Sequence, residues 1–152
     1  MNNGEKLKVV ETILERAATK IGDITNTVME EFYRTESELQ SLFTQHRPVN
    51  TIQLEAGMVE QALYCYMRWF ESPGEVEMTL LGSVPHHAET LNVTVEHYRK
   101  LLLAMSAVVN QSIPLDNVSE RKIWQEITDN LLGIVELADR NVFPEKQLTA
   151  LR

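Results

Sequence analysis

Residues 84–105, VPHHAETLNVTVEHYRKLLLAM, join a histidine pair to a strongly apolar run. The pair, His86 and His87, follows a proline and precedes a short polar linker. After this linker, apolar residues recur at spacings of three and four, the pattern of one helical face, and predict a helix over about 95–110. Because imidazoles are common metal ligands, the segment before this helix is a candidate binding site.

Towards the N-terminus, the same spacing predicts three further helices. The first covers about 5–21 and ends at Gly22, the second breaks near 35–37, and the third covers 51–70. The polar stretch before the third, which contains Pro48, is predicted to be a loop. The apolar stripe of the third helix consists of Ile52, Ala56, Val59, Leu63, Met67 and Phe70.

Two more helices are expected to end at prolines. A short apolar stripe predicts a helix over 75–84, which we expect Pro85 to disturb. If the stripe continues by one turn it includes His87, whereas His86 lies roughly 100° further round the helix axis. The last helix is expected to end at Pro144. Its potential N-terminal caps are Asp116, Asn117 and Ser119.

The composition is that of one globular domain. With 152 residues, 43% of them apolar, the chain can bury about two-thirds of the surface that it exposes when unfolded. No segment alternates with the two-residue period of a strand, and no repeat or long linker divides the chain. We therefore predict a single all-α domain over residues 1–152, with six to eight helices around one core.

The charge and the hydropathy exclude several classes of protein. A formal net charge of -8 opposes binding to the phosphates of nucleic acid. No apolar run reaches the roughly 20 residues that cross a bilayer, and the opening residues mix acids with bases, unlike a signal peptide. The single cysteine, Cys65, has no partner for an internal disulfide and is predicted to be a buried thiol. We expect a soluble, cytoplasmic protein without a nucleic-acid or membrane partner.

Two segments carry a resemblance to a known family. After His87, apolar residues follow at four and six positions and an aromatic at eleven. These residues are Leu91, Val93 and Tyr98. Residues 28–43, VMEEFYRTESELQSLF, contain an aromatic pair and end in Leu-Phe. In pattern and spacing, with low identity, both segments resemble the globin family, in particular bacterial single-domain and sensor globins, over about residues 5–140. The resemblance implies a globin-like fold.

The resemblance also implies that the chain binds haem b. His87 would be the axial ligand of the iron. His86, one residue out of register, is the alternative, and we favour His87 on spacing and helical phase. Phe43 would stack on the haem plane, and Glu55 would face the bound gas. The other residues implied to line the haem are Met29, Val59, Leu63, Leu91, Val93 and Tyr98.

Some positions depart from the family pattern. Met29 stands where many bacterial globins have a tyrosine, and Glu55 stands in place of a glutamine. An ionised carboxylate accepts hydrogen bonds but donates none, so we expect weak stabilisation of bound oxygen. Tyr98 is expected either to reach toward the proximal imidazole or to pack with its hydroxyl in water. In the first case Glu136 or Asp139 would join it and raise the basicity of the ligand. His97 is expected to be a solvated surface group.

The function implied by the resemblance is binding of a diatomic gas, oxygen, nitric oxide or carbon monoxide, for transport, sensing or detoxification. The enzymatic form would be a nitric oxide dioxygenase that takes electrons from an external reductase. A homodimer through the last two helices, as in sensor globins, is a further expectation. The alternative is a globin-fold domain without haem that serves as a signalling or interaction module, and an unrelated helical regulatory domain comes third.

Overall fold

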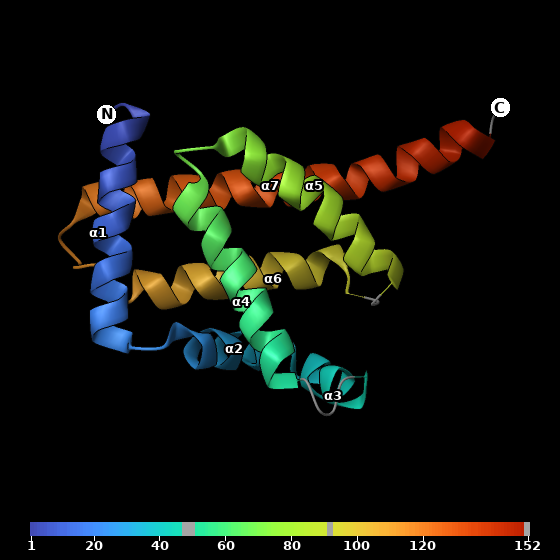
Figure 1. The fold of residues 1–152 in the computed structure, drawn as a ribbon, viewed down its shortest axis with the longest axis horizontal. Coiled ribbons are helices and arrows are strands. Elements are labelled where there is room, and N and C mark those ends of the chain that lie inside the picture. The colour runs from blue at the N-terminus through green and yellow to red at the C-terminus, as the bar shows by residue number, and fades with distance from the viewer. Residues whose placement is uncertain (47–50, 91–92, 151–152) are drawn as a thin grey trace.

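The structure, a computed structural model, describes residues 1–46, 51–90 and 93–150. All regular structure in this part of the chain is helical, as predicted (Figure 1). The helices are α1 (Asn3–Ile21), α2 (Ile24–Thr35), α3 (Ser37–His46), α4 (Thr51–Arg68), α5 (Pro73–Thr90), α6 (Val95–Asn110) and α7 (Val118–Ala150). These seven helices of the described residues enclose one core, so the prediction of an all-α fold with six to eight helices around one core is confirmed.

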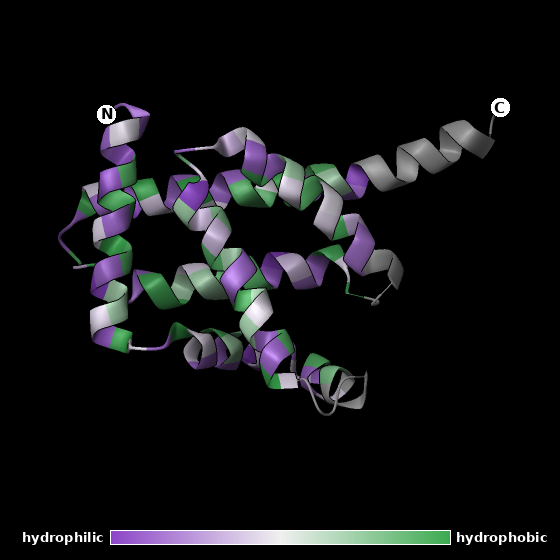
Figure 2. Ribbon diagram, viewed as in Figure 1, coloured by the Kyte–Doolittle hydropathy of each residue, from purple (hydrophilic) through white to green (hydrophobic). Residues whose placement is uncertain are grey.

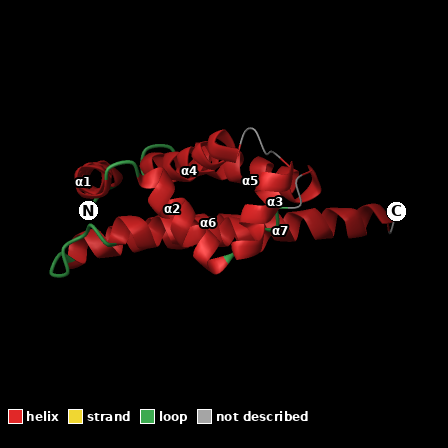
Figure 3. Ribbon diagram, turned by 90° about the horizontal axis from the view of Figure 1, so that it is seen from below, coloured by secondary structure: helices red, strands yellow, loops and turns green. Residues whose placement is uncertain are grey.

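The helices form two layers. Helices α2, α6 and α7 lie in one layer, where α6 contacts both α2 and α7 (Figures 1 and 3). Helices α4 and α5 lie over it and diverge from the short turn that joins them, so that together they form a V (Figures 1 and 3). In Figure 2 apolar and polar residues alternate along the described helices, the pattern of amphipathic helices whose apolar sides meet in a core.

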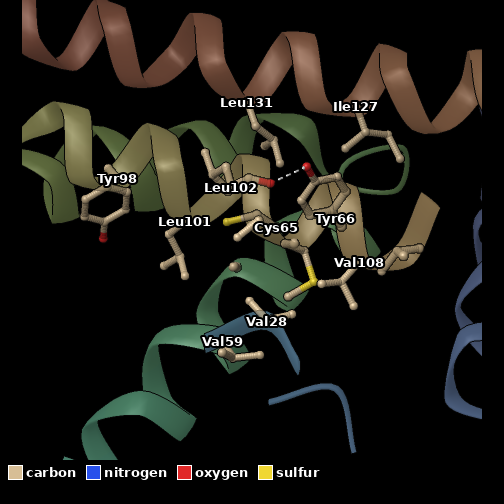
Figure 4. Packing of buried hydrophobic residues seen from close by; sticks show 14 of the residues in the cluster. Val28, Val59, Cys65, Tyr66, Tyr98, Leu101, Leu102, Val108, Ile127 and Leu131 are labelled. Carbon is tan, nitrogen blue, oxygen red and sulfur yellow. Dashed lines mark hydrogen bonds between the residues drawn. The ribbon is translucent and has the colours of Figure 1, made fainter. Parts of the chain in front are cut away.

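Tyr66 of α4 anchors the upper layer in the lower one. Its ring stacks on Trp124 of α7, with 4.3 Å between the ring centroids. Its hydroxyl lies 2.8 Å from the Thr128 hydroxyl and donates to the carbonyl of Leu102, 3.2 Å away (Figure 4). Because Tyr66 is fully buried, these bonds satisfy a hydroxyl that would otherwise destabilise the core. Helices α4, α6 and α7 are therefore fixed relative to one another at this point.

Most predicted helix boundaries agree with the structure. The helix predicted over 95–110 is α6, and the predicted break near 35–37 separates α2 from α3. Of the three potential caps of α7, Asn117 is used: its side-chain oxygen accepts from the backbone N–H of Glu120 at 3.1 Å. The polar stretch predicted as a loop starts at Thr44, but α3 continues to His46; residues 47–50, which include Pro48, lie outside the described residues.

Two predicted helix ends are wrong, since α5 continues through Pro85 and α7 continues through Pro144. A proline removes one hydrogen-bond donor, but its fixed φ is itself helical. The residue before it is the one that resists the helical conformation, and Val84 is 1% exposed. Burial of such a side chain contributes about 1.5–3 kcal/mol, which is comparable with the roughly 3 kcal/mol that an interior proline costs.

His97 has a structural role that the sequence analysis missed. Its Nδ1 accepts a hydrogen bond from the backbone N–H of Thr94 at 3.1 Å, and the Thr94 hydroxyl accepts from the backbone N–H of His97 at 3.2 Å. This reciprocal pair is a capping box at the start of α6. The prediction of a merely solvated side chain is corrected accordingly.

Cys65 is fully buried next to Tyr66, as predicted (Figure 4). Burial in an apolar environment disfavours the thiolate and raises the pKa of the Cys65 thiol from 9.0 to about 11. None of the helices in the described part of the chain is long and apolar enough to span a membrane.

The turn between α1 and α2 predicts a measurable effect of one methyl group. Gly22 ends α1 with φ +78° and ψ −132°, a conformation that L-residues rarely adopt. We expect Gly22→Ala to lower the free energy of unfolding by about 1–2 kcal/mol in urea denaturation. Gly57→Ala, at an exposed helical position with no atom near the added Cβ, is the matched control and should be neutral or stabilise by up to about 1 kcal/mol. Equal effects of the two changes would contradict this explanation.

The buried thiol predicts a pH dependence. Below pH 9.0 both folded and unfolded states hold the neutral thiol, while between pH 9.0 and about 11 only the unfolded state loses the proton. The free energy of unfolding should therefore fall across this window, by up to about 3 kcal/mol from this group. Urea denaturation measured from about pH 8 to about pH 11 checks this. Across that range the free energy of unfolding should fall less steeply for Cys65→Ala than for the wild type. The tyrosines are present in both proteins, so an identical slope would refute the assignment.

Candidate functional site

His87 lies on α5 with its imidazole oriented by the helix itself. Its Nδ1 is 2.8 Å from the backbone carbonyl oxygen of Ser83, one turn earlier. Because a carbonyl only accepts, Nδ1 carries the proton and Nε2 keeps its lone pair. His87 is half-buried and His86 is exposed, with their rings edge to face at 5.9 Å. This difference agrees with the helical phase from which the sequence favoured His87.

Tyr98 of α6 packs against the same imidazole from the other side. The two rings meet edge to face with centroids 5.4 Å apart, so the ring of Tyr98 reaches the imidazole of His87, the first of the two expected arrangements. Its hydroxyl, however, lies 2.6 Å from the Ser83 hydroxyl and is not solvated. Burial raises the pKa of the Tyr98 hydroxyl, so it remains protonated and can donate. Figure 4 shows Tyr98 at the edge of the buried cluster.

Gln61 of α4 completes a bridge between three helices. Its side-chain oxygen accepts from Tyr98 at 3.3 Å, and its side-chain nitrogen donates to the Ser83 hydroxyl at 3.2 Å. We call these three side chains the Gln61–Ser83–Tyr98 bridge. The sequence analysis named only Tyr98 among them. Gln61 and Ser83 lie 22 residues apart, and neither belongs to an apolar stripe, so no local pattern marks them.

The carboxylates expected beside Tyr98 are elsewhere. Glu136 and Asp139 are both exposed on α7. Glu136 approaches Arg140, one turn later, at 4.0 Å. The expectation that one of them joins Tyr98 is therefore wrong, because the buried face of α7 is formed by other residues. The group that Tyr98 meets is the Ser83 hydroxyl.

Glu55 is half-buried near the start of α4 and has a specific partner. The Tyr33 hydroxyl of α2 donates to its carboxylate at 2.6 Å. Burial, and then this hydrogen bond, raise the pKa of Tyr33 far above its usual value. Phe43 is 5% exposed, and its ring lies edge-on to that of Tyr33 with centroids 6.4 Å apart. Met29, one turn before Tyr33, is a buried core residue.

The sequence analysis named Glu55 as the residue facing a bound gas and did not identify Tyr33 as its partner. Tyr33 was noted only as part of an aromatic pair. A signal was available, because a residue four positions after Met29 lies on the same helical face. The sequence could not show that this face meets α4.

The other residues predicted to line the haem lie in two different places. Val59 and Leu63 lie between α4 and α1, and Val93 lies beside His87 after the end of α5. Val59 and Leu63 line a groove against α1, so they do not share a pocket with His87 as expected. Val93 is 8% exposed, and its backbone N–H donates to the carbonyl of His87 at 3.2 Å. Leu91 lies outside the described residues.

The V of α4 and α5 sets the position of the site. The bridge joins the two arms, whereas Glu55 and His87 lie further out, toward the open end. Glu55 precedes Gln61 by six residues, about 9 Å along α4, and His87 follows Ser83 by one turn, about 6 Å along α5. The described residues contain no group of three or more His, Cys, Asp or Glu side chains that could hold a metal ion. Nε2 of His87 is one possible donor at this place.

A single imidazole donor is too few to hold a bare metal ion. Phe43 and Val93 are buried in the core, and Leu54 and Met58 of α4 are packed against it. The Gln61–Ser83–Tyr98 bridge, by contrast, already satisfies its own polar groups. Comparisons of the chain with protein-family models, with curated proteins and with solved structures find no match.

The contact between Tyr33 and Glu55 predicts an energetic coupling. We expect a double-mutant cycle with Tyr33→Phe and Glu55→Gln, measured by urea denaturation, to give a coupling of about 1 kcal/mol or more. Tyr64, whose hydroxyl interacts with Glu75, provides the control: Tyr64→Phe and Glu55→Gln should add within about 0.5 kcal/mol. Additive effects of Tyr33→Phe and Glu55→Gln would show that the hydrogen bond contributes nothing to stability.

Proposed function

We propose that the chain binds haem b through Nε2 of His87 and uses it to bind a diatomic gas. The observation that carries this proposal is the 2.8 Å hydrogen bond from His87 Nδ1 to the carbonyl of Ser83. It selects the tautomer whose Nε2 can act as a ligand, and it prevents rotation of the ring. An axial ligand needs this arrangement.

The residues around His87 support this role. A hydrogen bond from Nδ1 to a carbonyl increases the electron density on Nε2 and strengthens it as a ligand. Tyr98 contacts the imidazole edge to face, which further restricts its orientation. Bound haem would supply an iron with one open position for oxygen, nitric oxide or carbon monoxide.

Glu55 and Tyr33 would set the preference among these gases. The Tyr33 hydroxyl donates to Glu55, so its proton is already used, and an ionised carboxylate has none to give. Bound oxygen gains most from a hydrogen-bond donor, so we expect weak oxygen binding relative to carbon monoxide. This property suits sensing or nitric oxide removal better than storage, and removal would need an external reductase as electron donor. A homodimer through α6 and α7, which carry the exposed Leu103 and Leu137, is part of the same proposal.

A second candidate function is that of a globin-like signalling or interaction module without haem. The observation that favours it is the Gln61–Ser83–Tyr98 bridge, which ties α4 to α5 and α6 without any cofactor. Under this alternative the His87 hydrogen bond serves only to satisfy a half-buried imidazole.

Titration of the purified protein with hemin distinguishes the two. The wild-type chain should give a Soret band that shifts when the reduced protein receives carbon monoxide, and His87→Ala should lower hemin affinity by about a hundredfold or more. His86→Ala, which changes the exposed neighbour, is the matched control and should bind as the wild type does. No uptake of hemin by the wild type, or equal losses in both variants, would reject the haem proposal and favour the module.

A further inference from the structure

A groove of about 470 Å³ lies between α1 and α4, and the proposed haem site does not use it. Small side chains keep it open, because alanines from both helices and Gly22 from the turn line its walls. Its larger apolar lining residues are Leu14, Ile24, Val59, Leu63 and Met67. Val59 is buried and forms part of the floor, while Met67 is 48% exposed at one end.

The groove follows an apolar stripe that the rest of the chain leaves partly uncovered. Ile52, Ala56, Leu63 and Met67 recur along α4 at intervals that keep them on one helical face. From Ile52 to Met67 this face is about 22 Å long. Ile52 is 82% exposed, so the stripe continues beyond the groove itself. A contiguous apolar strip of this kind on an otherwise charged surface marks an interaction site more often than chance exposure does.

The charges on the groove indicate what binds there. Asp23 and Glu60 are the charged residues that line it, and both carboxylates are exposed. Asp23 accepts one hydrogen bond, from the backbone N–H of Thr25, and Glu60 has no ion pair with any described residue. With a formal net charge of -8, the whole chain adds to the negative potential. A cationic partner is therefore favoured.

The same charges oppose a second copy of this chain in the groove. Two copies face to face would bring their Asp23 and Glu60 carboxylates together, and like charges across an interface are strongly unfavourable. A compact small molecule would fill the groove but leave the exposed stripe near Ile52 uncovered. An elongated partner with apolar residues on one face and basic residues beside them covers both, which is the helix-in-groove mode of recognition.

We propose that the groove between α1 and α4, with its continuation along the α4 stripe, binds one basic amphipathic helix of a partner protein. The apolar face of that helix would contact Leu63 and Met67. Its flanking lysines or arginines would meet Asp23 and Glu60. The site is separate from His87, so binding there does not depend on the haem proposal.

The test uses the full chain and a synthetic helical peptide of about 18 residues, long enough to cover the stripe at about 1.5 Å per residue. The labelled probe has leucines on one helical face and lysines on the other, and its counterpart carries glutamates in place of the lysines. Fluorescence anisotropy should show binding of the lysine peptide, weakened by salt, and at least about tenfold weaker binding of the glutamate peptide.

Matched variants locate the binding. Met67→Lys should weaken binding of the lysine peptide by about tenfold. Met78→Lys adds the same positive charge at an exposed methionine of α5 outside the groove, so it should show only the smaller loss of affinity that comes from the charge. Likewise Glu60→Gln should weaken binding about two- to threefold at low salt, and Glu11→Gln, an exposed acid of α1 outside the lining, should not.

Three results would overturn the proposal. The first is equal binding of both peptides, and the second is equal effects of Met67→Lys and Met78→Lys. The third is a wild-type dimer that Met67→Lys converts to a monomer, which would assign the groove to a second copy. Circular dichroism of each variant confirms that it is folded before binding is compared.

Discussion

Ser83 connects the candidate site to the framework of the fold through two different atoms. Its backbone carbonyl holds the imidazole of His87, and its hydroxyl meets both Tyr98 and Gln61. The orientation of the imidazole therefore depends on α5 and on the Tyr98 ring of α6, whereas the position of that part of α5 depends on α4 and α6. Because each of these polar groups is at least partly buried, loss of one partner leaves the others unsatisfied.

The framework itself rests on apolar packing around Tyr66. The stacked Tyr66 and Trp124 rings, together with the hydrogen bonds to Leu102 and Thr128, join α4 to α6 and α7. This contact lies near the end of α4 that is joined to α5, so both arms of the V diverge from a fixed point. The other ends of the arms carry Glu55 and His87.

The two sides of α4 differ in their chemistry. Toward α2 and α5, Glu55 and Gln61 each have a hydrogen-bond partner, and the sites they form are internal to the chain. Toward α1, the surface is apolar and carries small side chains. The acids at its edges, Asp23 and Glu60, are exposed. One helix thus contributes to an internal polar site and to an external apolar surface, because successive residues of an α-helix point about 100° apart.

The candidate site could be predicted only in part. His87 could be preferred over His86 because burial follows the helical period, and Glu55 could be placed on the inner side of its helix for the same reason. Leu63 was misplaced, since the apolar stripe of α4 was taken to face one partner when it faces α1 and solvent. Pro85 was wrongly taken as a helix end, since packing of Val84 can offset the loss of one hydrogen bond. Pro144 also lies inside a helix.

The sequence by itself determined what depends on neighbours within a turn or two: the helices, the break between α2 and α3, and the phase of the histidine pair. Tertiary structure decided which polar groups meet. Tyr33 and Glu55 are 22 residues apart, Ser83 and Tyr98 are 15 apart, and Gln61 and Tyr98 are 37 apart. No helical period connects residues at such separations, because their contact depends on how the helices cross, and this is set by the packing of the whole core.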